Sequence, residues 1–363
     1  MPLVAHNGLP TFSRLRNNGL EILGLDDARH QDIRELHIGF LNMMPDAALT
    51  ATERQFINLI GNCNKIARFY VYPFSIAQLN RGEKAEAHIA KHYFRFEDLK
   101  KQGLDALIIT GANVINPALD QEKFWDPLIE IVQWAEQNVA SIMCSCLTTH
   151  ALVKFYHGID RQHLARKHWG VFQHRVCRPD HPLVRDINTR FDAPHSRFNT
   201  LEKAAFEQAG LTVLAEGDKA GVLLAVSADL FRLVYFQGHP EYDSFSLLKE
   251  YKREVFRFLH GELEAPPPYP ENYFCSEAKR IAVRYLERAM LAKQRKEELP
   301  VFPEHEILPL VENTWRDTGK AIINNWLGLV YRTTNLDRKL QYMDGINADD
   351  PLQLMADSGP QSG

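Results

Sequence analysis

The feature that most constrains the fold is an alternation of short apolar runs with segments of helical periodicity. The apolar runs are rich in β-branched and aromatic residues, which predicts strands at 36–43, 66–72, 105–110 and 139–144. The spacing of apolar residues between them predicts helices at 48–60, 125–137 and 147–156. Strands that alternate with helices form a parallel sheet covered on both faces, so the predicted fold class is α/β with an open, mostly parallel sheet.

The length of 363 residues allows one large domain with an appendage. We expect an N-terminal arm at 1–35 and an α/β catalytic domain at 36–264. The stretch Ala265–Pro270 contains four prolines and predicts a stiff linker that leaves the domain. It opens a segment at 265–344, whose helical patterns at 276–298 and 318–331 predict a helical extension packed on the core. The polar end at 345–363 is expected to be disordered.

Composition excludes several classes of protein. The net charge of −4 argues against a nucleic-acid footprint. The N-terminus lacks the features of a signal peptide, and no apolar run reaches about 18 residues, so we expect a cytoplasmic protein. The number of cysteines, 5, is odd, which disfavours a disulfide framework. Cys144 and Cys146 have no second pair at zinc-site spacing, so no metal site is predicted.

Four segments with polar or reactive residues follow predicted strands. In a parallel sheet, ligands bind at the carboxyl ends of the strands. The segments are Asn42–Met44, Thr110–Ala112, Ser145–Cys146 and, after the apolar run 233–236, Gln237–Glu241. Their convergence at one edge of the sheet predicts a single active site.

Cys146, His239 and Glu241 supply a thiol, an imidazole and a carboxylate, the three groups of an acyl-transferring cysteine site. Cys146 lies where a strand meets a helix, and a helix N-terminus favours a thiolate. The backbone N–H of Leu147 is the natural first donor to an oxyanion, and Gly111–Ala112 or Asn42–Met43 would give a second. Cys144 is a weaker candidate nucleophile because it lies within the strand, and His150, inside the next helix, ranks below His239.

A basic stretch lies between 161 and 175. It contains Arg161, Arg166, Lys167, His168 and Arg175. A solvated face and a cradle for an anionic substrate are both compatible with this pattern.

These residues resemble a known family, the homoserine O-succinyltransferases of methionine biosynthesis, built on the flavodoxin-like fold of class I glutamine amidotransferases. The resemblance runs from about Leu9 to Asp337 and is carried by several motifs in order. They are Leu41–Pro45, Thr110–Ala112, Cys146 with Tyr156–Ile159, Ala193–Arg197, Gly238–Asp243, Trp315–Arg316 and Asn325–Leu327. The segment from about Cys275 to Val311 departs from the family as an insertion, for which the sequence suggests no chemical role.

The resemblance implies a ping-pong acyl transfer with acyl-coenzyme A as co-substrate and no bound cofactor. Cys146 would carry the acyl group as a thioester, His239 would accept the proton of homoserine, and Glu241 would orient His239. Lys167, Ser196 and Arg253 would bind substrate, and we expect a homodimer. Ile115 occupies the position that helps to set acyl preference in the family. Relatives that use succinyl-CoA tend to have a glycine there, and relatives that use acetyl-CoA a glutamate that would repel the succinyl carboxylate.

Three other functions remain open at this point. Acetyl-CoA as donor or serine as acceptor would keep the chemistry and change the substrate. A glutamine amidotransferase-type hydrolase would share the fold, although the segment Cys144–Thr148 departs from the G-x-C-x-G of most amidotransferases. A non-catalytic regulator is disfavoured because a binding module has no need of all three reactive groups.

Overall fold

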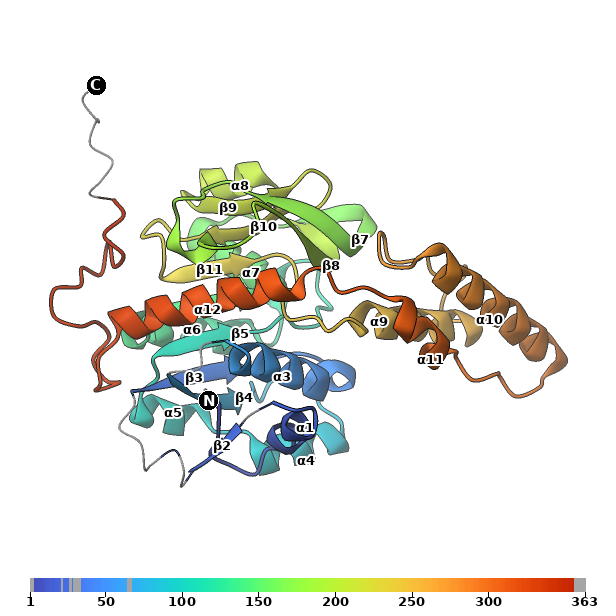
Figure 1. Cartoon of the computed structure of the whole chain (residues 1–363), viewed down its shortest axis with the longest axis horizontal. Helices are drawn as coiled ribbons and strands as arrows, with labels where there is room; N and C mark the ends of the chain where they lie inside the picture. The colour runs from blue at the N-terminus through green and yellow to red at the C-terminus, as the bar shows by residue number, and fades with distance from the viewer. Residues whose placement is uncertain (1–2, 21, 26–27, 29–33, 64–66, 356–363) are drawn as a thin grey trace.

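The computed structural model describes residues 3–20, 22–25, 28, 34–63 and 67–355, arranged around one sheet (Figure 1). The sheet has 11 strands in the order β2-β1-β4-β3-β5-β6-β11-β10-β9-β7-β8. The strands are β1 Leu3–Ala5, β2 Ile22–Gly24, β3 Glu35–Leu41, β4 Arg68–Phe74, β5 Ala106–Ile109, β6 Ser141–Ser145, β7 Gln162–Val176, β8 Arg190–Thr200, β9 Thr212–Gly217, β10 Gly221–Val226 and β11 Leu233–Phe236. From β2 to β11 neighbouring strands are parallel, and from β11 to β8 they are antiparallel.

The helices cover both faces of the sheet. They are α1 Pro10–Asn17, α3 Asp46–Gly61, α4 Glu83–His92, α5 Phe96–Gln102, α6 Trp125–Asn138, α7 Leu147–His157, α8 Lys203–Gln208, α9 Ser246–Leu259, α10 Ser276–Arg295, α11 Glu304–Ile307 and α12 Arg316–Thr333. Side chains alternate across the central strands. Ile38 and Ile108 pack in one core with α3 and α12, whereas Leu107 and Ile109 pack in a second core with α6 and α7. The predicted α/β class with a mostly parallel sheet is confirmed.

The predicted central elements match the observed ones closely. The helices expected at 48–60, 125–137 and 147–156 are α3, α6 and α7, and α7 ends at Gly158 in the left-handed conformation, φ 67°. The strands expected at 36–43, 105–110 and 139–144 are β3, β5 and β6. The strand expected at 66–72 is β4, which begins at Arg68, and residue 66 lies outside the described residues.

The antiparallel end of the sheet was not predicted. β7 and β8 form its edge, and their pairing is irregular between His163 and His168. The first half of β7 is largely exposed, so it lacks the continuous apolar run of a buried parallel strand. Most of the basic stretch therefore lies in β7, which pairs with β8.

The N-terminal and C-terminal segments both contribute to the core. β1 and β2 extend the parallel edge of the sheet. After the proline-rich segment, α10 and α11 project away from the sheet (Figure 1) and enclose a third core with α9. The chain then returns as α12, whose Trp326 is fully buried and donates its Nε1–H to Ser141 Oγ at 2.8 Å.

The proline-rich segment is joined to β7 by backbone hydrogen bonds. The Glu271 N–H donates to the Trp169 carbonyl at 2.8 Å, and the Val171 N–H donates to the Glu271 carbonyl at 2.9 Å. A Cβ on Gly170, φ 147°, would lie 2.2 Å from that carbonyl oxygen, so only glycine permits this approach.

Part of the tail expected to be disordered is described. Residues 345–355 form turns, in which Asp350 accepts hydrogen bonds from the backbone of Leu354 and Met355, and residues 356–363 lie outside the described residues. The domain boundaries stay predictions. None of the helices in the described ranges is long and apolar enough to cross a lipid bilayer.

Candidate active site

Cys146 lies at a sharp turn between a strand and a helix. β6 ends at Ser145, α7 begins at Leu147, and Cys146 between them has φ 54° and ψ −107°. A positive φ is costly for a side chain other than glycine, and such strain is typical of a nucleophile held on a tight turn. The backbone fixes the turn, because the Cys146 N–H donates to the Phe236 carbonyl at 2.7 Å. This bond links the thiol to β11, the strand that leads to His239.

His239 and Glu241 form a buried pair just beyond β11. His239 Nδ1 lies 2.8 Å from Glu241 Oε1, which leaves the Nε2 atom for another partner. The Cys146 sulfur acts on the same imidazole and raises its pKa. The His239 N–H also donates to the Pro194 carbonyl at 2.8 Å, and the Tyr242 ring stacks on the imidazole at 4.4 Å between centroids. The imidazole therefore bonds to the carboxylate of Glu241 and is influenced by the sulfur of Cys146.

The charges around His239 favour its protonated form. Burial alone would lower the pKa of the imidazole, but the Glu241 carboxylate and the Cys146 sulfur outweigh burial. The pKa of His239 consequently lies well above its ordinary value of 6.5. An imidazolium at this position stabilises a thiolate on Cys146 and holds a proton ready for a leaving group.

The other candidate nucleophile and base lie in unsuitable surroundings. Cys144 is fully buried in β6, between β5 and β11, and burial raises the pKa of its thiol far above the ordinary range. His150 is buried in α7, where it bonds to Gln237 Oε1 at 2.9 Å, and burial lowers its pKa to about 3. Both side chains serve the core, in agreement with the lower rank that the sequence analysis gave them.

Two backbone amides lie beside Cys146 as candidate oxyanion donors. Within the described residues, neither Leu147 N–H nor Gly111 N–H donates to a protein acceptor. A Cβ on Gly111 would lie 3.6 Å from the Leu147 nitrogen, so these two segments of the backbone lie close together. The Met43 N–H, by contrast, already donates to Thr110 Oγ1 at 2.9 Å. Of the two loops considered from the sequence, the geometry therefore favours the one at Gly111 as the partner of Leu147.

Lys167 and Ser196 meet at one carboxylate that sequence reasoning did not identify. Glu250 on α9 accepts hydrogen bonds from Lys167 Nζ at 3.1 Å, Ser196 Oγ at 2.6 Å and Tyr242 Oη at 2.7 Å. Burial would raise the pKa of Glu250, but Lys167 and the two hydroxyls hold it below its ordinary value. Since Tyr242 also stacks on His239, Glu250 links the predicted substrate residues to the predicted base.

A cavity of about 360 Å³ lies beside His239, Glu241 and Glu250. Its lining includes Gly111, Ser145, His239, Glu250 and Arg253. The guanidinium of Arg253 is about half exposed and pairs with Glu254. The cavity thus combines a reactive end at the strand termini with a charged end on α9.

Ile115 lies in the loop that follows β5. Its side chain is 86% exposed, and its backbone N–H donates to Glu122 Oε1 at 2.6 Å. The same oxygen accepts the Asn116 N–H at 2.6 Å, so one buried carboxylate holds this loop in place. Ile115 does not line the cavity described above, and its role in acyl preference stays a prediction.

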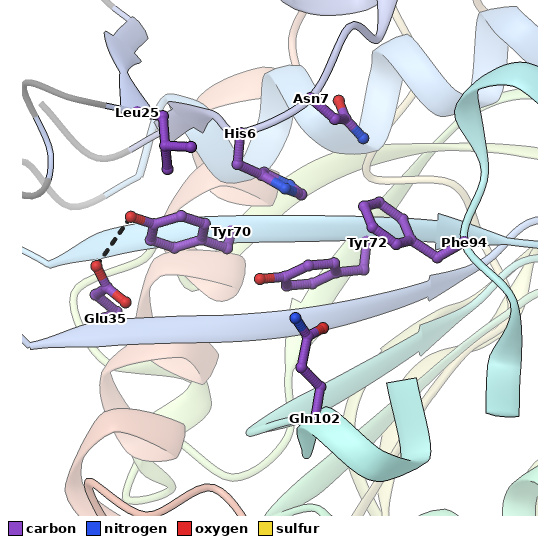
Figure 2. Close-up of a pocket in the computed structure, with 8 residues that line it drawn as sticks. All are labelled: His6, Asn7, Leu25, Glu35, Tyr70, Tyr72, Phe94 and Gln102. Atoms are coloured by element: carbon purple, nitrogen blue, oxygen red, sulfur yellow. Dashed lines mark hydrogen bonds between the residues drawn. The ribbon is translucent and has the colours of Figure 1, made fainter. Parts of the chain in front are cut away.

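A second cavity, of about 460 Å³, lies away from these residues. Figure 2 shows its wall of aromatic rings, among them His6, Tyr72 and Phe94. His6 and Tyr72 contact each other with centroids 4.6 Å apart, and Glu35 at the start of β3 accepts a hydrogen bond from Tyr70. Among the described residues, its lining includes no cysteine or serine and so no nucleophile of the kind found at Cys146.

Comparisons with known proteins find relatives that match nearly the whole chain. The homoserine O-succinyltransferase family profile matches residues 2–336. A homoserine O-succinyltransferase from Methylobacter tundripaludum is 57% identical over 354 residues, covering 98% of this chain and 100% of that protein. One from Thiothrix nivea is 55% identical over 359 residues, covering 99% of this chain and 100% of that protein.

Among solved structures, a glutamine amidotransferase from Methylobacillus flagellatus aligns with a TM-score of 0.46 and 13% identity, over 86% of this chain and 97% of that chain. The family profile and the two relatives span nearly the whole sequence. The chain therefore belongs to the homoserine O-succinyltransferase family.

Proposed function

We propose that this protein transfers the succinyl group of succinyl-CoA to the hydroxyl of L-homoserine by way of a thioester on Cys146. The observation that carries the proposal is the buried pair of His239 and Glu241 at 2.8 Å, at the end of the strand whose Phe236 carbonyl fixes the turn at Cys146. Family membership supplies the substrates, since the relatives are homoserine O-succinyltransferases. The products are O-succinyl-L-homoserine and CoA.

The first half-reaction loads the enzyme. The Cys146 thiolate attacks the thioester carbonyl of succinyl-CoA, and the N–H groups of Leu147 and Gly111 stabilise the oxyanion that forms. The carbon–sulfur bond to CoA then breaks, and the His239 imidazolium gives its proton to the departing CoA sulfur. Glu241 stays ionised and keeps Nε2 directed at the reacting atoms.

The second half-reaction transfers the acyl group. The neutral His239 accepts the proton of the homoserine hydroxyl, whose oxygen attacks the thioester carbon on Cys146. The carbon–sulfur bond breaks, which restores the thiolate and the imidazolium. No metal or redox cofactor enters either step.

The charged end of the cavity matches the free amino acid. Glu250 offers a carboxylate for the ammonium group of homoserine, and Lys167 and Arg253 offer cations for its carboxylate. Without substrate, Lys167 and Ser196 both bond to Glu250, so the acceptor would exchange these bonds for its own. The cytoplasmic location and the homodimer remain predictions.

Mass spectrometry of the acyl-enzyme tests this function. Incubation with succinyl-CoA in the absence of homoserine should add one succinyl group to the peptide that contains Cys146. Cys146→Ala should lose the adduct and turnover, whereas Cys144→Ala should retain both, because its sulfur is enclosed in the sheet. An adduct on Cys144 alone would refute the assignment.

An assay of thiol release with several acyl donors and acceptors tests the proposed substrates against the alternatives. Thiol release should be fastest with succinyl-CoA and homoserine. Faster release with acetyl-CoA, or with serine as acceptor, would change the substrate assignment and leave the chemistry in place. Ammonia release from glutamine would instead favour the hydrolase.

A further inference from the structure

The loop that carries the proposed base and its carboxylate lies between β11 and α9. We call residues 237–245 the catalytic loop, which contains His239 and Glu241. All of these residues are described, and none of them lies in a strand or a helix, so the position of the imidazole depends on contacts with other parts of the chain. A displacement of about 1 Å in an active site can reduce the rate about 100-fold, so such contacts matter for catalysis.

Two buried side chains from outside the catalytic loop donate hydrogen bonds to its backbone. Trp315 Nε1–H donates to the Tyr242 carbonyl at 2.8 Å, and the Tyr273 hydroxyl donates to the Ser244 carbonyl. Trp315 is 1% exposed and Tyr273 is 5% exposed. Both rings pack in the third core, which α9, α10 and α11 enclose. Because neither ring can move without disturbing that core, they hold two carbonyls of the loop at fixed positions.

The two donors lie on either side of the segment to which the sequence gave no chemical role. Tyr273 lies just before α10, and Trp315 directly precedes α12. The segment from about Cys275 to Val311, which forms α10 and α11, is therefore flanked at both ends by a donor to the same loop. α10 and α11 project away from the sheet (Figure 1), but their core reaches the catalytic loop through these two rings.

The first turn of α12 also lies against the catalytic loop. A Cβ on Gly319 would lie 2.9 Å from the carbonyl oxygen of Pro240, the residue between His239 and Glu241, so an alanine there would require the helix or the loop to shift. At Gly328, later in the same helix, a Cβ would meet no other atom of the described residues within 4 Å, apart from the helix's own backbone. Of these two glycines, Gly319 is the one that fits against the loop.

Tyr242 links the backbone of the catalytic loop to both ends of the cavity. Its ring stacks on the His239 imidazole, with centroids 4.4 Å apart and planes inclined by 20°. Its hydroxyl donates to Glu250 Oε1 at 2.7 Å. Since Trp315 holds the carbonyl of the same residue, a change at Trp315 should alter the base and the acceptor carboxylate together.

We propose that Trp315 and Tyr273 are positioning residues for the acyl transfer, and that the core of α10 and α11 sets the place of the His239 imidazole through them. Both act through the backbone of the catalytic loop and have no need to touch the substrate. This inference rests on the proposed function. It gives the Trp315–Arg316 motif and the α10–α11 segment a shared role.

A matched pair of tryptophan variants tests the proposal. Trp315→Phe and Trp326→Phe each remove one indole hydrogen bond of 2.8 Å and keep an aromatic ring, but Trp326 donates to Ser141 in the central core. Active sites are first counted as succinyl thioester formed per chain, so that unfolded protein does not enter kcat. Per active site, kcat of Trp315→Phe should fall by about 2- to 12-fold and KM for homoserine should rise. Both constants should stay within about twofold of wild type in Trp326→Phe.

The kinetic constants per active site separate a positioning role from a stabilising one. If Trp315 only stabilised the fold, Trp315→Phe would form fewer thioesters per chain and leave kcat per active site and KM unchanged. That result would overturn the proposal, and so would equal changes in Trp326→Phe.

Glycine and tyrosine variants decide the question if Trp315→Phe does not fold. Gly319→Ala should lower kcat per active site by at least about threefold, whereas Gly328→Ala should retain wild-type kinetics. Tyr273→Phe loses only the hydroxyl and should lower kcat by about 2- to 12-fold. Wild-type kcat in both Gly319→Ala and Tyr273→Phe would refute the inference. If the wild type and Gly328→Ala themselves formed no thioester or did not transfer it to homoserine, the proposed function would fall instead.

Discussion

Glu250→Gln isolates the charge at the acceptor end of the cavity with little change in shape. Glu250 Oε2 accepts from Lys167 and Ser196, and Oε1 accepts from Tyr242. A glutamine can place its carbonyl oxygen at the first position and its amide nitrogen at the second, where the Tyr242 hydroxyl rotates to accept. All three contacts then survive, and only the negative charge is lost.

The expected fall in kcat/KM follows from the loss of the negative charge on Glu250 alone. A hydrogen bond to a charged group contributes about 1.5–3 kcal/mol, so kcat/KM for homoserine should fall by roughly 10- to 150-fold. Lys167 keeps a cation–π contact with Trp169 at 4.4 Å, so the melting temperature should change little. Glu250→Ala should lower both kcat/KM for homoserine and the melting temperature further, because it leaves three donors without their acceptor.

Rapid-quench measurement of CoA release separates the two half-reactions. Without homoserine, the first-turnover burst should be preserved in Glu250→Gln, whereas steady-state turnover at limiting homoserine should fall. Glu262→Gln is a matched control, because Glu262 forms an exposed ion pair with Arg257 just beyond α9. A burst reduced as much as turnover, or an unchanged kcat/KM for homoserine, would contradict the role of Glu250.

Three further predictions concern the catalytic turn and the core. Glu241→Gln should reduce kcat less than His239→Ala, because it removes an orienting charge and keeps the proton carrier, and equal losses would contradict the roles. Gly238→Ala should reduce kcat and cost about 1–3 kcal/mol in urea unfolding, because its Cβ would lie 2.9 Å from His195 Nε2; a stable, active variant would refute this packing. Burial lowers the pKa of His181 to about 4, so the unfolded chain binds a proton that the folded chain refuses as pH falls from 6.5. The free energy of unfolding should therefore decrease by roughly 3 kcal/mol between pH 6.5 and about 4 for this group alone. Urea unfolding at several pH values should show a weaker pH dependence of this free energy in His181→Asn, and an unchanged pH dependence would contradict the assignment.

The parallel half of the fold was predictable because burial on both faces leaves a plain pattern. The segment Ala106–Ile109 is entirely apolar, and Gly158 marks the end of α7 as expected. The antiparallel edge was not predictable in the same way. The first half of β7 is mostly exposed, and its irregular pairing with β8 breaks the alternation that would identify a strand.

The residues of the candidate site also differ in how far the sequence could predict them. Cys146 and His239 follow apolar strands, so their convergence could be inferred from the topology of a parallel sheet. Glu250 gives no such signal, because it reads as one more charged residue on the amphipathic helix α9. The role of Glu250 depends on contacts with Lys167 and Ser196 in distant segments, which no local pattern records.

The position of α12 has a consequence for synthesis on the ribosome. Its residues complete the core on one face of the central sheet, although α12 follows α10 and α11 in the sequence and is therefore synthesised after them. The nascent chain therefore emerges with the strands that carry Cys146 and His239 still lacking their cover. The enzyme should acquire its native packing only near the end of translation, and transcripts truncated before α12 should yield chains that are degraded or retained by chaperones.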